Sequence, residues 1–204
     1  MYKRQDDAIG AVFTALDRSG RRGDTVVIFT SDHGDHLGDH RLMLKGAEQY
    51  QGIVRVPFIW SDPAASGGPP RSQALGSTMD IAATILDRAR IEPYSGMQGR
   101  SLSPALRGGP GPRDSVFIQY DHQHPSPGTH VPPRVHTLID GRHRLSVFHG
   151  TGWGELYDLD GDPGEYQNLW DNPAHAAMRA RMTERLLLTE IEHVDRVPLP
   201  TRRA

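Results

Sequence analysis

Residues 24–40, DTVVIFTSDHGDHLGDH, carry the strongest fold signal in this sequence. Residues 26–29 are continuously apolar and mostly β-branched, and polar residues bound them on both sides. Such a run is typical of a strand covered on both faces, as in a parallel α/β sheet. Residues 31–40 follow directly and are dense in carboxylates and imidazoles. Because sites in open α/β sheets gather where strands end, we expect a functional site here.

The residues on either side of this run predict further elements of a mixed α/β domain. Before it, apolar side chains recur at helical spacing up to a stop at residues 19–20; they are Ile9, Val12, Phe13 and Leu16. After it, residues 54–60 predict a second strand, which Pro57 places at an edge or a bulge. Residues 80–87 predict a helix, capped at Thr78 or Asp80.

The second half of the sequence has a different pattern, which predicts an antiparallel sheet and a helix. The four short strands expected there are residues 115–120, 135–139, 144–148 and 155–159. Residues 171–173, Asp-Asn-Pro, open a long helix. Its apolar positions include Met178, Met182, Leu186, Ile191 and Val194. Trp153 and Trp170 are expected in the core.

Together these elements predict an α/β protein in two parts. Residues 1–112 are expected to form part of a central sheet with flanking helices and to carry the ligand-rich segment. Residues 113–204 are expected to form a smaller subdomain of short antiparallel strands and a terminal helix. A Gly/Pro cluster at residues 108–112 marks the boundary between them.

Composition excludes several classes of function. The 204 residues carry a net charge of −2, which gives no basic footprint for nucleic acid. No apolar run approaches the ~20 residues of a membrane span, and the first residues lack a signal-peptide core, so the cytoplasm is the default expectation. The absence of cysteine excludes disulfides, thiolate metal sites and a cysteine nucleophile.

An ordered series of motifs resembles the sulfatase family within the alkaline phosphatase superfamily. The matching stretches are residues 26–40, Lys45-Gly46, 55–59 (RVPFI), 77–86, 96–102, 155–159 (ELYDL), 162–165 (DPGE) and Asn168-Leu169. They run in the family's order from about residue 5 to about residue 190. The resemblance implies a partial alkaline-phosphatase-like sheet.

The resemblance covers the C-terminal part of the family pattern. Family members begin with a strand that bears two metal-binding aspartates, followed by Cys-x-Pro-x-Arg, whose cysteine (serine in some members) is oxidised to the formylglycine nucleophile. This sequence has no cysteine, and residues 61–63, Ser-Asp-Pro, lack the arginine and lie downstream of the metal motif. We therefore expect a truncated chain, a fragment or one half of a split enzyme whose partner supplies the N-terminal half.

The resemblance implies roles for three residues. Asp32 and His33 are similar to the last two metal ligands of the family, and Lys45 is similar to the lysine that contacts the sulfuryl oxygens and orients the nucleophile. The implied cofactor is a divalent ion, Ca²⁺ or, given the imidazole, Mn²⁺ or Zn²⁺. The simpler alternatives are that Asp32 caps a turn, that His33 is merely polar and that Lys45 is solvated.

Other histidines have weaker claims to a site. His33, His36 and His40 would share one face of a helix and suggest zinc, but Gly34 and Gly38 favour a loop. Asp35, His36, Asp39 and His40 are therefore expected to order that loop. One of the residues of a later Pro-rich stretch could contact a leaving group, although an exposed polar loop is the simpler expectation; they are His122, His124, His130, Arg134 and His136.

The sequence therefore predicts a sulfatase-like hydrolase that acts on a small-molecule sulfate ester with the help of a metal. The formylglycine cannot come from this chain, so the chain alone is expected to be inactive or nearly so. One alternative is a phosphonate monoester or phosphodiester hydrolase, which His33 favours because many calcium-type sulfatases have Asn there. The other is a non-catalytic binding or scaffolding module that has lost its chemistry.

Overall fold

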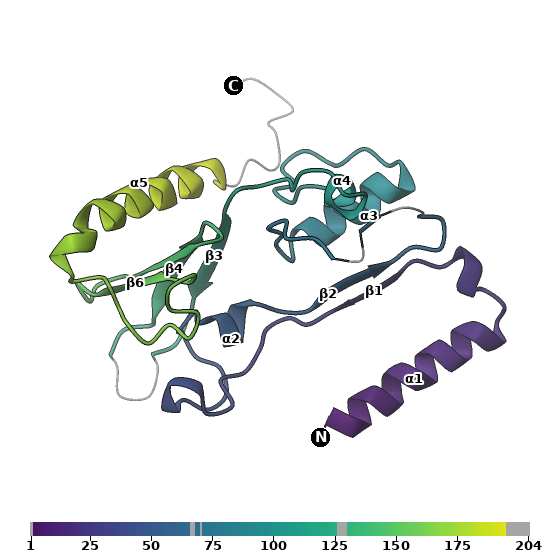
Figure 1. The fold of residues 1–204 in the computed structure, drawn as a ribbon, viewed down its shortest axis with the longest axis horizontal. Coiled ribbons are helices and arrows are strands. Elements are labelled where there is room, and N and C mark those ends of the chain that lie inside the picture. Colours follow the sequence, from purple (N-terminus) through teal and green to yellow (C-terminus); the bar gives the residue numbers. More distant parts are fainter. Residues whose placement is uncertain (1, 66–67, 70, 126–129, 195–204) are drawn as a thin grey trace.

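A computed structural model describes residues 2–65, 68–69, 71–125 and 130–194. Figure 1 shows the order of the elements along the chain. The helices are α1 (Tyr2–Arg18), α2 (Gln51–Val54), α3 (Asp80–Ala89), α4 (Ser103–Leu106) and α5 (Ala176–Glu192), with 3-10 turns η1 (Arg22–Asp24), η2 (Asp39–Arg41) and η3 (Pro173–His175). The strands are β1 (Val27–Thr30), β2 (Phe58–Ser61), β3 (Val116–Asp121), β4 (Arg134–Ile139), β5 (His143–Phe148) and β6 (Gly154–Asp158).

The first part of the chain is built around a two-stranded ribbon. β1 pairs antiparallel with β2, with Val27 opposite Ser61, so the prediction of a parallel sheet around β1 is wrong for the described residues. Both strands are also open to solvent, and Phe29 and Ile59 remain 40% and 57% exposed. The apolar run indicates that the strand favours burial. It predicts neither the direction of the neighbouring strand nor the polypeptide segment that covers the strand.

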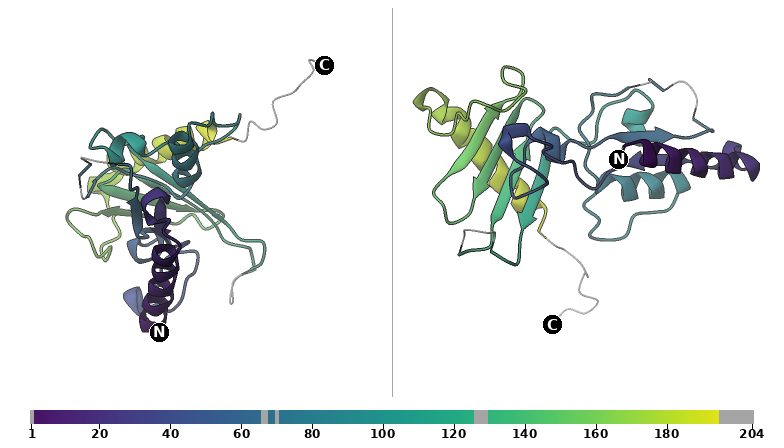
Figure 2. Two further views of the ribbon diagram at one scale, coloured as in Figure 1. Left: turned by 90° about the vertical axis from the view of Figure 1, so that its right-hand side faces the viewer. Right: turned by 90° about the horizontal axis from the view of Figure 1, so that it is seen from below.

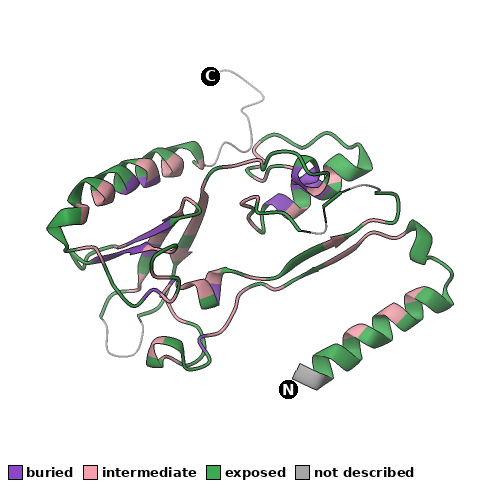
Figure 3. Ribbon diagram, in the orientation of Figure 1, coloured by how far each residue is buried: buried purple, intermediate pink, exposed green. Residues whose placement is uncertain are grey.

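The predicted N-terminal helix is confirmed as α1, but little of the described chain covers its apolar face. Ile9, Phe13 and Leu16 are partly exposed, and Val12 is 69% exposed. Figures 1 and 2 show α1 projecting away from the C-terminal sheet, and Figure 3 shows it largely exposed. Among the described residues, no helix combines the length and apolar content that a bilayer crossing requires.

Two predicted boundaries differ from the structure. The strand expected over residues 54–60 begins later, because Val54 ends α2 and Pro57, which has no N–H to donate, directly precedes β2. The helix expected over residues 80–87 is α3, whose N-cap position is Met79 without a side-chain cap. Asp80 is the first helical residue, and its buried carboxylate accepts from the backbone N–H of Ser77 at 2.8 Å and pairs with Arg113.

The second part matches its prediction closely. β3, β4, β5 and β6 form an antiparallel sheet in sequence order, and α5 packs across one face of it (Figure 1). The predicted long helix is present as α5 but begins at Ala176, later than expected; residues 172–173 start the preceding turn η3, where the Asn172 side chain accepts from the backbone N–H of Ala174 at 3.0 Å. The core between sheet and helix consists of Leu138, Leu145, Leu156, Met182 and Leu186.

Some predicted core residues lie at the surface. Ile191 and Val194 are 58% and 60% exposed, because at this end of α5 it is Glu190 and His193 that contact the sheet, through His136 and Phe117. Trp153 is 43% exposed and packs on Phe148 with ring centroids 4.5 Å apart. Trp170, by contrast, packs against the core as predicted.

Two adjacent leucines of α5 test this account of the core. Leu186 is 4% exposed and Leu187 is 55% exposed, so Leu→Ala at the two positions changes helix propensity equally and burial very differently. Leu186→Ala is expected to lower the free energy of unfolding by ~2–5 kcal/mol, and Leu187→Ala by less than ~0.5 kcal/mol. Urea denaturation followed by circular dichroism measures both, and equal losses would contradict the packing of α5 on the sheet.

Candidate active site

The segment after β1 brings together the three residues that the sequence predicted for the site. Asp32 and His33 follow the strand directly, and the Asp32 Oδ2 atom lies 3.4 Å from His33 Nε2. Lys45, twelve residues later, places its Nζ atom 2.6 Å from the same nitrogen. The Asp32 side chain is 83% exposed and that of His33 is 36% exposed, so the cluster is open to water.

Hydrogen bonds fix how His33 presents its ring. His33 Nδ1 lies 2.7 Å from the carbonyl oxygen of Gly34, an acceptor, so the network assigns the ring proton to Nδ1. Nε2 then carries the lone pair, and it faces both the ammonium of Lys45 and the carboxylate of Asp32. A backbone carbonyl on the far nitrogen is the usual way in which proteins orient a metal-binding histidine.

Asp32 divides its two oxygens between local structure and the cluster. Oδ1 accepts from the backbone N–H of His33 at 2.9 Å and from the hydroxyl of Ser31 at 3.3 Å. The backbone N–H of His33, helped by the Ser31 hydroxyl, lowers the pKa of Asp32 below its usual value. Asp32 is therefore an ionised carboxylate whose Oδ2 faces His33, and its turn contact is compatible with a ligand role.

This donor set fits one half of a divalent-metal site. One carboxylate oxygen and one imidazole nitrogen suit Ca²⁺, Mn²⁺ or Zn²⁺, but even a tetrahedral zinc site needs four ligands. Within the described parts of the chain, no group of three or more His, Cys, Asp or Glu side chains is placed to hold a metal. Asp32 and His33 can serve as two ligands of a site whose other ligands lie elsewhere.

The remaining histidines of the loop do not join this cluster. His36 is 2% exposed and meets the Tyr50 ring edge-on, with ring centroids 5.9 Å apart. His40 stacks on the same ring, with centroids 3.7 Å apart. The segment is a loop with the single turn η2, as the glycines predicted, so no helical face presents three imidazoles. Asp35 orders the loop by accepting from the backbone N–H of Leu37 at 2.9 Å.

The histidines of the later Pro-rich stretch follow β3 or lie in β4. His136 in β4 contacts Glu190 of α5 and Asp121 of β3, which are structural partners. His122 bonds to the backbone of His124. Part of the Pro-rich stretch, residues 126–129, lies outside the described residues. These contacts agree with the simpler expectation of a polar loop.

An open hollow of about 730 Å³ lies between the loop after β1 and the C-terminal sheet. Its lining includes His40, Glu48 and Tyr50 on one side and Trp153 and Tyr166 on the other. None of Asp32, His33 and Lys45 is among its lining residues. No local pattern in the sequence predicts this hollow, because the hollow forms where the loop after β1 faces residues that are distant in the sequence.

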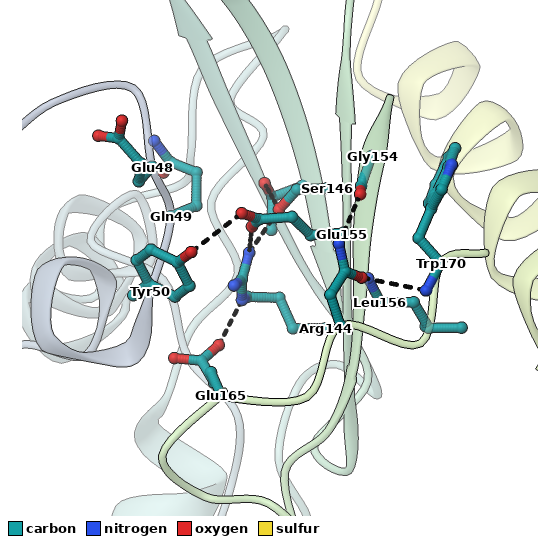
Figure 4. Close-up of polar contacts among 12 residues, drawn as sticks. Glu48, Gln49, Tyr50, Arg144, Ser146, Gly154, Glu155, Leu156, Glu165 and Trp170 are labelled. Carbon is teal, nitrogen blue, oxygen red and sulfur yellow. Dashed lines mark hydrogen bonds and ion pairs between the residues drawn. The ribbon is translucent and has the colours of Figure 1, made fainter. Parts of the chain in front are cut away.

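Sequence reasoning also missed a buried ionic cluster next to this hollow. Arg144, Glu155 and Glu165 are at most 2% exposed; Arg144 contacts both carboxylates, and Glu155 accepts from the hydroxyl of Tyr50 (Figure 4). The one available signal was charge at positions of β5 and β6 that alternate with apolar residues. Glu155 and Glu165 stand in the stretches 155–159 and 162–165 that resemble the family, and that resemblance names no partner for either side chain.

Comparison with known proteins places these features in a family. A family model described as Sulfatase matches residues 1–91. The chain is 33% identical to the uncharacterized sulfatase YidJ of Escherichia coli, over 97% of this chain and 37% of that protein. It is 30% identical to an N-acetylglucosamine-6-O-sulfatase of Bacteroides thetaiotaomicron, over 95% of this chain and 35% of that protein.

Solved structures agree with these relatives. The phosphonate monoester hydrolase of Agrobacterium radiobacter superposes with a TM-score of 0.84 and 30% identity, covering 98% of this chain and 41% of that one. The chain thus spans about two fifths of the length of the proteins it matches. Over that length, motif order, sequence and fold agree, and they place the chain in the sulfatase / alkaline phosphatase superfamily.

Proposed function

We propose that this chain is the metal-ligand and lysine-bearing part of a hydrolase that cleaves sulfate esters. The observation that carries this proposal is the convergence of Asp32, His33 and Lys45 on one open point after β1. Sulfate ester cleavage needs a nucleophile and a positive charge near the sulfuryl oxygens. The chain supplies groups for the second need, and its lack of cysteine means that a cysteine-derived formylglycine comes from another polypeptide segment.

Each of the three residues has a defined task in this proposal. A bound divalent ion would polarise the sulfuryl oxygens and stabilise the negative charge that develops on them. Asp32 contributes an anionic oxygen to that ion, and His33 contributes the Nε2 lone pair that its Nδ1–H bond to Gly34 leaves available. Since Nε2 has one lone pair, the Lys45 ammonium and a metal are alternative partners for it. With a metal at Nε2, the Lys45 ammonium would be available to contact the sulfuryl group.

Manganese binding tests the ligand assignment in the chain as it exists. Mn²⁺ is expected to broaden the NMR signals of His33 and its neighbours in the full chain, weakly because two donors are fewer than a complete site needs. Asp32→Asn should lower the apparent affinity by ~10-fold or more, since the loss of even an outer-shell partner has effects of that size. Asp39→Asn, on the same loop, is the matched control and should leave the broadening unchanged. Equal broadening in Asp32→Asn and the parent chain would contradict the assignment.

Turnover tests the role of Lys45. The chain alone is expected to show no hydrolysis of an aryl sulfate, and turnover that Asp32→Ala abolishes would refute that expectation. Joining residues 1–204 to the N-terminal segment of a sulfatase that carries Cys-x-Pro-x-Arg should yield activity. In that chimera, Lys45→Ala should reduce kcat/KM by ~10²–10³-fold, the usual effect of removing one group that stabilises transition-state charge. A chimera that folds and binds Mn²⁺ but has no turnover would favour the non-catalytic module.

Phosphonate or phosphodiester hydrolysis is the second candidate function. It is supported by His33 and by the likeness to the phosphonate monoester hydrolase of Agrobacterium radiobacter, with a TM-score of 0.84. In the same chimera, the ratio of kcat/KM for an aryl sulfate to that for an aryl phosphonate separates the candidates. We expect the sulfate to be preferred, and a reversed ratio would assign the chain to the second function.

A further inference from the structure

The buried ionic cluster of Arg144, Glu155 and Glu165 links the C-terminal sheet to the segment that carries the metal ligands. We infer that these three residues are positioning residues, which hold Asp32, His33 and Lys45 in place through Tyr50 and α2. This inference rests on the function proposed above, because it concerns the same site. It gives the C-terminal subdomain a role in positioning the proposed site.

The cluster is an unusual arrangement of charge for a protein interior. Arg144 and Glu155 are fully buried and Glu165 is 2% exposed. Arg144 donates through Nε to Glu165 Oε1 and through Nη1 to Glu155 Oε2 at 2.8 Å and to Ser146 Oγ at 2.7 Å (Figure 4). One guanidinium thus faces two carboxylates, and its Nη2 atom has no hydrogen-bond partner among the residues that the structure describes. Since well-packed apolar residues often stabilise an interior at least as well, stability alone is a weak reason for this cluster.

The free oxygens of both carboxylates reach across to the first part of the chain. Glu165 Oε2 accepts from the backbone N–H of Gln51, the first residue of α2, at 2.6 Å. Glu155 Oε1 accepts from the hydroxyl of Tyr50 at 3.2 Å (Figure 4). The Arg144 guanidinium also lies 5.0 Å from the centre of the Tyr50 ring. The start of α2 is therefore held by these two carboxylates, beside a ring contact between Tyr50 and Tyr157 of β6 with centroids 6.2 Å apart.

From α2 the connection to the site takes one hydrogen bond. The carbonyl of Ile53 accepts from the backbone N–H of Gly34 at 2.8 Å. Gly34 is the neighbour of His33 and supplies the carbonyl that orients its ring. The two segments touch so closely that a Cβ at Gly34 would lie 1.8 Å from the carbonyl oxygen of Gly52. A shift of α2 must therefore move the peptide that sets the direction of His33 Nε2.

Tyr50 extends the same connection to the loop that leads to Lys45. His40 stacks on the Tyr50 ring with centroids 3.7 Å apart and planes 8° from parallel. Within this loop, His36 N–H donates to the carbonyl of Leu44, the neighbour of Lys45, at 3.0 Å. Burial and the nearby charge of Glu155 raise the pKa of Tyr50, which keeps its hydroxyl a donor. Both sides of the proposed site thus depend on the same pair of residues, Tyr50 and Gln51.

Glu165→Gln in the full chain tests this inference. The carboxylate uses one oxygen for Arg144 and the other for Gln51, and a carboxamide has a single acceptor oxygen, so the variant must lose one contact. Hydrogen exchange at the Gly34 amide should accelerate by ~10-fold more than exchange at the Leu145 amide in the sheet, as expected for a lost bond to a charged group. Binding of Mn²⁺ at His33 should weaken in parallel.

Asp158→Asn is the matched control, because it breaks a surface ion pair to Arg142 on the same sheet, 2.7 Å long. It should leave the ratio of Gly34 to Leu145 exchange unchanged. If Glu165→Gln fails to fold, Tyr50→Phe removes the hydroxyl that contacts Glu155 and Tyr157 while leaving Glu165 intact, and it should raise the ratio in the same direction. Equal acceleration at Gly34 and Leu145, or none, overturns the inference.

The two proposals fail in different ways. A parent chain that binds Mn²⁺ through Asp32, combined with an unchanged exchange ratio in Glu165→Gln and Tyr50→Phe, overturns the positioning role and leaves the hydrolase proposal in place. A raised exchange ratio in a parent chain that binds no Mn²⁺ shows that the cluster holds the segment but overturns its role in metal binding.

Discussion

The guanidinium of Arg144 lies between two carboxylates, and the remaining oxygens of those carboxylates grip the beginning of α2. Apolar packing gathers within the C-terminal part, between α5 and the sheet, whereas charged and polar contacts fix α2 to that sheet. Hydrogen bonds are directional, so these contacts define the position of α2 on the sheet more narrowly than apolar packing would. We infer that the orientation of the His33 ring depends on the position of α2, through Gly34.

Much of the fold could be predicted from the sequence, because the spacing of apolar residues follows which side chains are buried. The four strands of the C-terminal sheet alternate their side chains and are confirmed, and the long helix is confirmed as α5, although the Asn-Pro pair at residues 172–173 starts the 3-10 turn that precedes it. The apolar run in β1 was correctly read as a strand. Its pairing was not, since a continuous apolar run carries no information on the direction of its neighbours.

The site divides in the same way between local and distant information. Asp32, His33 and Lys45 stand in a short ordered motif, which made them predictable from the residues and their resemblance to a family. Their support was not predictable, because Glu165 meets Gln51 across 114 positions and Tyr50 meets Glu155 across 105. Such pairs have no local periodicity, and buried glutamates look like surface residues until their partners are known.

The ribbon of β1 and β2 has a consequence for how this sheet can grow. In a two-stranded sheet each member is an edge, and within the described chain the outer row of backbone N–H and C=O groups on each strand faces no further strand. Another polypeptide segment can therefore extend the sheet sideways from either margin by main-chain bonding alone, without disturbing the existing register. The ribbon whose first strand directly precedes Asp32 and His33 is thus also the part of the chain from which a larger sheet can be built.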